Sequence, residues 1–183
     1  MHLRVALTSV AAMLFLLVSL IKAGPTSARD NGLLDVTCSP PSSDNAVYSP
    51  PLTLTPQMVA VNSSFQLGPC VSLSTPALTS GTAVAVIPPR LRNCLDLLDA
   101  GTSTRTISWN TGATSTLSMN RTTTTVGALL VNTYTGTVTS GLFAGDTVLM
   151  TVTSPATDIT LCTLGLGTVP SVFGVVTLEI TAV

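Results

Sequence analysis

The chain has 183 residues, of which 45% are hydrophobic and only 8% are charged. Beyond residue 28 it contains five arginines and eight acidic residues, a formal net charge of −3, and it contains neither lysine nor histidine. This composition excludes a broadly basic surface for nucleic acid, and the lack of histidine excludes Ser-His-Asp and Cys-His catalysis.

The first 28 residues predict a secretory signal peptide. They combine a basic start, an apolar run over residues 5–21 and small residues up to Ala28, which is the order of a signal sequence. Cleavage is expected after Ala28, with cleavage after Ala23 as an alternative. An uncleaved N-terminal anchor is a second alternative, because the apolar run is just long enough to span a bilayer. No later stretch is apolar enough for a second span, so the mature protein is predicted to be secreted, without contact to a membrane.

The segment after the signal predicts a loose leader followed by one domain. Residues 29–46 are rich in Asp, Asn, Ser and Pro, and the domain is expected at 47–183. Residues 47–54 alternate apolar with polar side chains, but Pro50 and Pro51 interrupt the pattern. Because proline cannot donate to a strand ladder, this segment is predicted to be an edge strand.

The organising stretch is a threonine-rich β-meander at residues 105–152. Ile107 and Trp109 are two positions apart and share one strand face, and Leu117 and Met119 do the same on the next segment. Both pairs can line one face only if the two residue numbers in each cross-strand pair add up to an even number. The loop around Gly112 must therefore have an odd number of residues. This register places Trp109 in the predicted core.

The remaining elements complete an all-β prediction. Outside the meander, strands are expected at 58–67, 83–87, 159–162 and 176–180, with one helical turn at 91–98. About eight short strands, with turns about every ten residues and no sustained helical period, indicate an antiparallel Ig-like β-sandwich or a small barrel.

The four cysteines predict two disulfides, since all of them follow the signal peptide and their number is even. Three pairings are possible. The favoured one joins Cys70 to Cys94, which closes a local loop, and Cys38 to Cys162, which ties the start of the domain to its end. A tetrahedral metal site is not expected, because the chain has no CxxC pair and no histidine beyond the signal. No cofactor is predicted.

Three aromatic residues are candidates for binding a ligand. Trp109, Tyr48 and Tyr134 are typical of platforms on which sugar rings stack. For Trp109 the core interpretation is favoured, because this residue shares its strand face with Ile107.

The charged residues predict no active site. A carboxylate pair for glycoside hydrolysis is conceivable from residues such as Asp96 and Asp99, but a turn role is favoured for both. Their spacing also lacks the pattern of a calcium loop. Arg105 and Arg121 alternate with the apolar residues of the meander, which predicts that their side chains emerge at the rim of the sheet. No catalytic residue is assigned.

Three segments carry a resemblance to a known group of proteins. They read YSPPLTLTP at 48–56, TRTISWNTGATSTLSMNRT at 104–122 and GTVTSGLFAGDTVLMTVTSP at 136–155. In these segments the chain resembles a family of uncharacterised β-rich proteins secreted by actinobacteria, streptomycetes in particular, that have four cysteines. The resemblance implies secretion, a single domain and no assigned enzymatic activity.

The sequence therefore favours a secreted, non-catalytic β-domain. Its predicted role is that of an extracellular structural, cell-envelope or interaction module, and its predicted partner is an extracellular protein or glycan. A carbohydrate-binding module that uses exposed aromatic residues is the alternative, and a glycan-active enzyme is the third hypothesis.

Overall fold

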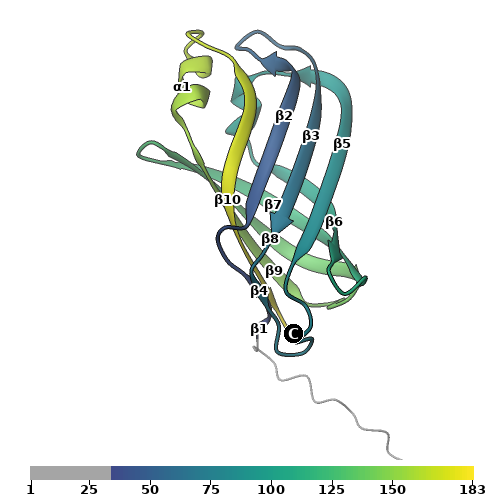
Figure 1. Ribbon diagram of the computed structural model, residues 1–183. Coiled ribbons are helices and arrows are strands. Elements are labelled where there is room, and N and C mark those ends of the chain that lie inside the picture. Colours follow the sequence, from purple (N-terminus) through teal and green to yellow (C-terminus); the bar gives the residue numbers. More distant parts are fainter. Residues whose placement is uncertain (1–33) are drawn as a thin grey trace, which may run out of the picture.

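The computed structural model describes residues 34–183, so the predicted signal peptide lies outside the described residues. Ten strands, one 3-10 helix and one α-helix form this part of the chain (Figure 1). In chain order they are β1 (Leu34–Cys38), β2 (Ser43–Leu52), β3 (Gln57–Leu67), β4 (Cys70–Val71), β5 (Gly81–Arg92), η1 (Cys94–Leu97), β6 (Gly101–Trp109), β7 (Thr114–Val126), β8 (Leu129–Gly141), β9 (Thr147–Pro155), α1 (Thr157–Thr163) and β10 (Val169–Thr181).

Eight of the strands close into an up-and-down barrel. The order β2-β3-β5-β6-β7-β8-β9-β10 is antiparallel throughout, and β10 pairs with β2 to complete the circle. The predicted all-β antiparallel fold is confirmed in the form of the barrel that was expected as an alternative to the Ig-like sandwich. Bulges near Val59 and Leu117 bend long strands, and such bends help a twisted sheet to close.

β1 and β4 extend the sheet at one end of the barrel. The first part of β10 pairs with β2, whereas its last residues pair with β1, which in turn pairs with β4. Residues 34–46 were predicted to belong to a loose leader, and this is wrong, because they form β1 and the start of β2. Despite the polar composition of this segment, Val36 and Cys38 are fully buried. They belong to the apolar core and pair with Ile180 and Leu178 of β10.

Two other local predictions also need correction. Residues 47–52 of the expected edge strand at 47–54 belong to β2, which ends at Leu52. This strand has a partner on each side because the barrel is closed. The expected strand at 159–162 is part of α1. Ile159 and Cys162 are both buried, and a spacing of three residues places both on one face of a helix. The helical turn expected at 91–98 is confirmed as η1.

An apolar core fills the half of the barrel next to β1 and β4. Trp109 is only 3% exposed and lies there, as predicted. Its ring meets Phe143 edge to face with 6.3 Å between the ring centroids, and its Nε1 donates to Ser115 Oγ at 2.8 Å. A Cβ on Gly81 would come within 2.6 Å of the indole, so the absence of a side chain there makes room for the ring. Pairs such as Thr106 with Thr116 give the even register sum that was predicted.

The two predicted disulfides are present, but the favoured pairing is wrong. Cys38 bonds to Cys70, and Cys94 bonds to Cys162. The first bridge joins the neighbouring strands β1 and β4, and the second joins η1 to α1. The sequence argument assumed that Cys70 and Cys94 lie close together, whereas the whole length of β5 separates them. No helix within residues 34–183 is long and apolar enough to cross a membrane.

Candidate functional site

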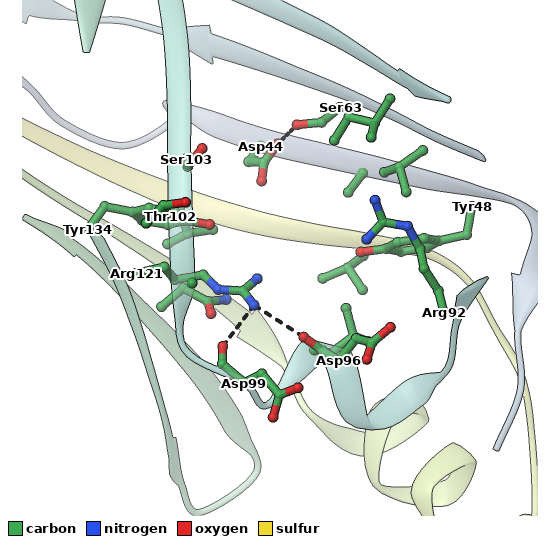
Figure 2. Close-up of a pocket in the computed structure, with 18 of the residues that line it drawn as sticks. Asp44, Tyr48, Ser63, Arg92, Asp96, Asp99, Thr102, Ser103, Arg121 and Tyr134 are labelled. Carbon is green, nitrogen blue, oxygen red and sulfur yellow. Dashed lines mark hydrogen bonds between the residues drawn. The ribbon is translucent and has the colours of Figure 1, made fainter. Parts of the chain in front are cut away.

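The half of the barrel next to η1 holds a cavity of about 710 Å3. Side chains of β2, β3 and β5 to β10 line it, together with η1 and the turn that follows it. Figure 2 shows polar groups from several strands pointing into this space. Eight-stranded barrels are wide enough to hold one small ligand, and the volume is in the range of small-molecule sites.

Every arginine in residues 34–183 lines the cavity. The four come from three different strands, since Arg90 and Arg92 lie on β5, Arg105 on β6 and Arg121 on β7. These residues are also the only cationic side chains in the described part of the chain. Within residues 34–183, the positive charge is therefore gathered around one cavity, with Arg90 at its exposed side.

Arg121 is held in place by backbone carbonyl groups. Its Nη2 donates to the carbonyl oxygens of Asp96 at 3.1 Å and Asp99 at 2.8 Å, and Figure 2 shows the guanidinium group directed into the cavity. Asn93 and Asp96 cap η1, since the Asn93 side chain accepts from Leu95 N and the Asp96 carboxylate accepts from Asn93 N. The rim beside Arg121 is thus ordered by its own hydrogen bonds.

Arg92 and Arg105 have buried nitrogen atoms without protein partners. Arg92 Nε and Nη2 and Arg105 Nε are buried and make no hydrogen bond within the described residues. The Arg105 guanidinium carbon lies 5.8 Å from the centre of the Phe65 ring, a cation-π contact. Burial lowers the pKa of Arg92, and the positive charge of Arg90 lowers it further.

The cavity raises the pKa of Asp44. Ser63 Oγ donates to its Oδ1 at 3.2 Å, and Figure 2 shows the carboxyl group facing the cavity. Burial raises the pKa of Asp44 to about 6, although the hydrogen bond from Ser63 and the charge of Arg105 act in the opposite direction. Removal from water disfavours the ionised carboxylate. Asp44 can therefore change charge in mildly acidic solution.

Two of the three predicted aromatic candidates lie in the cavity. Tyr48 and Tyr134 both line it, whereas Trp109 belongs to the apolar core at the other end of the barrel. Burial raises the pKa of Tyr48 to about 12 and also raises that of Tyr134, where the charge of Arg121 opposes the rise. Both phenols are therefore neutral hydrogen-bonding groups near neutral pH. A binding role for Trp109 on the surface is ruled out by its burial.

The sequence interpretation missed the arginines and Asp44. Arg105 and Arg121 were expected at a rim facing solvent, because an open sheet offers charged residues such a place. Their positions did contain the signal, since Arg105 is two residues from Ile107 and Arg121 is two residues from Met119, on the inward face of each strand. No such pattern surrounds Asp44. It lies in the polar segment 29–46, which was therefore assigned to the loose leader.

The cavity offers charged groups, hydroxyl groups and an amide for recognition of a ligand. No group of three or more potential metal ligands occurs among residues 34–183.

Comparison with protein-family models, with curated proteins and with solved structures gives no match to this chain. The resemblance to secreted streptomycete proteins therefore stays a prediction.

Proposed function

We propose that this protein is a secreted, non-catalytic interaction module that binds one small molecule inside its barrel. The observation that supports this most is a cavity of about 710 Å3 whose wall contains buried arginine nitrogens without protein partners. The two disulfides are consistent with an extracellular location.

The unpaired donors have an energetic consequence. A buried polar group without a hydrogen bond costs stability, and for a charged group the cost is larger. Buried donors in folded proteins therefore nearly always have partners, either protein groups, water or a ligand. A cavity that gathers such donors from separate strands is the arrangement expected of a binding site, where the ligand supplies the missing acceptors.

Carbohydrate binding is the second candidate. Tyr48 and Tyr134 place two aromatic side chains in the cavity wall, and Ser103 and Asn132 add hydroxyl and amide groups. Aromatic faces beside hydrogen-bonding side chains suit a sugar ring. In contrast to the surface platform expected from the sequence, this site admits a small sugar and not a long polysaccharide, because the barrel wall surrounds it.

A pair of matched substitutions on β6 tests ligand binding in the barrel. Ser103 lines the cavity, whereas Ser108 on the same strand is exposed on the outer face. Ser103→Phe should fill part of the cavity, and Ser108→Phe should add the same ring outside it. A library of neutral and acidic sugars and small organic compounds is screened by the amide shifts of 15N-labelled protein.

Compounds that bind should shift the amides around Asn132 and Tyr134 in the wild type and in Ser108→Phe, and should lose that effect in Ser103→Phe. If binding survives in folded Ser103→Phe, or if the shifted amides map to the outer face, the barrel interior is not the site and the proposal is wrong.

A further inference from the structure

The described chain is acidic, yet its cavity is positive. Residues 34–183 contain four arginines and seven acidic residues, a formal net charge of −3. All four arginines line the cavity, but only Asp44, Asp96 and Asp99 among the acids do. With every one of these groups ionised, the cavity has one net positive charge, and it has two when Asp44 is protonated. This charge balance suits a monoanion.

Arg92 presents the edge of its guanidinium group that binds oxyanions. Nε and Nη2 lie on the same edge of the group, so their N–H bonds point in nearly parallel directions and match two oxygens of a carboxylate, sulfate or phosphate. Both nitrogens are buried and both lack a partner in the described structure. One acidic group of a ligand would satisfy both donors at once.

The neighbours of Arg92 do not supply this acidic group. Arg92 Nε and Nη2 have no hydrogen-bond partner within residues 34–183, and the Asp96 carboxylate accepts from the backbone of Asn93. Figure 2 shows Arg92 and Arg121 directed into the same space from two sides. In addition to burial, the charges of Arg90 and Arg121 both lower the pKa of Arg92, whereas the charge of Asp96 raises it. An anion between Arg92 and Arg121 would offset the repulsion between these two arginines.

We propose that the ligand is a small organic acid, bound as a monoanion, whose acidic group pairs with the Nε and Nη2 edge of Arg92 while Arg121 contributes a second positive charge from across the cavity. This inference rests on the proposed function and specifies its ligand class. The remainder of the ligand lies beside Tyr48 and Tyr134, which accept either an acidic sugar or an aromatic acid. Probes of both kinds distinguish an acidic sugar from an aromatic acid.

Binding of the acid is expected to strengthen as the solution becomes mildly acidic. Asp44 (β2) faces the cavity with Ser63 (β3), Arg105 (β6) and Tyr134 (β8), and its own strand adds Tyr48. Asp44 changes charge between pH 5 and pH 7.5, because burial raises its pKa to about 6, whereas the raised pKa values of Tyr48 and Tyr134 keep both phenols neutral over this range. Its protonation removes a negative charge that repels the ligand.

The test is a titration of the purified full-length chain, with its disulfides formed, at low salt and at pH 5 and pH 7.5. Four probes form two pairs of similar shape, glucuronate with glucose and benzoate with benzyl alcohol, and inorganic sulfate is the fifth probe. The readouts are the side-chain Nε–H signal of Arg92 and the backbone amide of Asn132. The variants are Arg92→Lys, which keeps the charge but removes the two-donor edge, and Arg92→Gln, which removes both.

At least one acid should bind saturably, move the Arg92 Nε–H signal and exceed its neutral counterpart in affinity by about tenfold or more, a difference of about 1.4 kcal/mol. Binding should be tighter at pH 5, weaker in Arg92→Lys and weakest in Arg92→Gln. If glucuronate binds more tightly than benzoate, the ligand is a sugar acid. If benzoate binds more tightly, the ligand is an aromatic acid.

Two results would overturn the inference, and they differ in what they mean for the proposed function. If glucose or benzyl alcohol shifts the cavity amides as strongly as its acid does, or if Arg92→Gln binds the acid unchanged, the barrel binds ligands but not through this charge. If no probe shifts any cavity amide, or if the shifts rise linearly without saturation and sulfate reproduces them, the inference fails and the cavity loses its support as a binding site.

Discussion

Replacing Asp44 with asparagine should stabilise the fold, and the gain should depend on pH. Burial raises the pKa of Asp44 from its ordinary value of 3.8 to about 6, so the folded state holds the proton more tightly than the unfolded chain does. Between about pH 4 and pH 6 the folded state therefore binds more protons, and its free energy of unfolding falls as the pH rises. Above this window the wild type carries the full cost of the buried carboxylate.

The magnitude of this cost follows from the pKa. A rise from 3.8 to about 6 corresponds to about 3 kcal/mol, at about 1.4 kcal/mol for each tenfold change in proton affinity. Asparagine does not ionise, and its amide oxygen can still accept the hydrogen bond from Ser63. Asp44→Asn should therefore match the wild type near pH 3.5 and exceed its stability by up to about 3 kcal/mol at pH 7.5.

Urea unfolding followed by the fluorescence of Trp109 measures this difference at each pH. Asp158→Asn is the matched control, because Asp158 is exposed in the first turn of α1, outside the cavity. Its loss should lower stability slightly near neutral pH, the opposite sign, since a negative charge favours the start of a helix. A stability difference for Asp44→Asn that stays flat from pH 3.5 to pH 7.5 would refute the claim that this carboxyl group is desolvated.

Three further predictions concern the scaffold that shapes the cavity. Trp109→Ala should cost about 3 to 5 kcal/mol in urea unfolding followed by far-UV circular dichroism, because the buried indole packs on Phe143 and bonds to Ser115. A loss below about 1 kcal/mol would contradict its core position. Gly81→Ala should cost about 1 to 3 kcal/mol, because its Cβ would press on the indole of Trp109. Gly101→Ala is the control and should be close to neutral, because nothing lies within 4 Å of the new Cβ. Equal losses of stability in the two variants would argue against this packing. Peptide mapping should recover the linked pairs Cys38–Cys70 and Cys94–Cys162, and a Cys70–Cys94 peptide would contradict the topology. The double substitution of Cys94 and Cys162 by alanine should cost about 4 kcal/mol in the chain-entropy model.

The sequence predicted those features of the fold that depend on local patterns. Alternation of apolar and hydroxyl side chains identified the meander, and the odd loop at Gly112 fixed the register that buries Trp109. Closure of the barrel could not be derived in the same way, because it depends on pairing between β2 and β10, which are distant in the sequence. The disulfide pairing failed for the same reason, since it follows from which distant strands become neighbours.

The candidate site was only partly accessible to sequence reasoning. Tyr48 and Tyr134 were identified as ligand candidates, and both line the cavity. Arg105 and Arg121 were predicted to emerge at the rim of the sheet, because they alternate with the apolar residues of the meander. In a barrel whose main apolar core occupies one half, the same inward positions in the other half open into a cavity. The change from rim to interior is thus a consequence of closure, which the local pattern does not encode.

The most direct measurement of the central claim is a crystal structure of the protein soaked with the acid that binds most tightly in the titration. The acidic group should lie on Arg92, with one oxygen about 2.7 to 2.9 Å from Nε and another at a similar distance from Nη2, and the remainder of the molecule beside Tyr48 and Tyr134. A barrel whose cavity is filled by rearranged side chains, or an Arg92 edge that is paired with Asp96 or Asp99 while the acid lies elsewhere, would contradict the account.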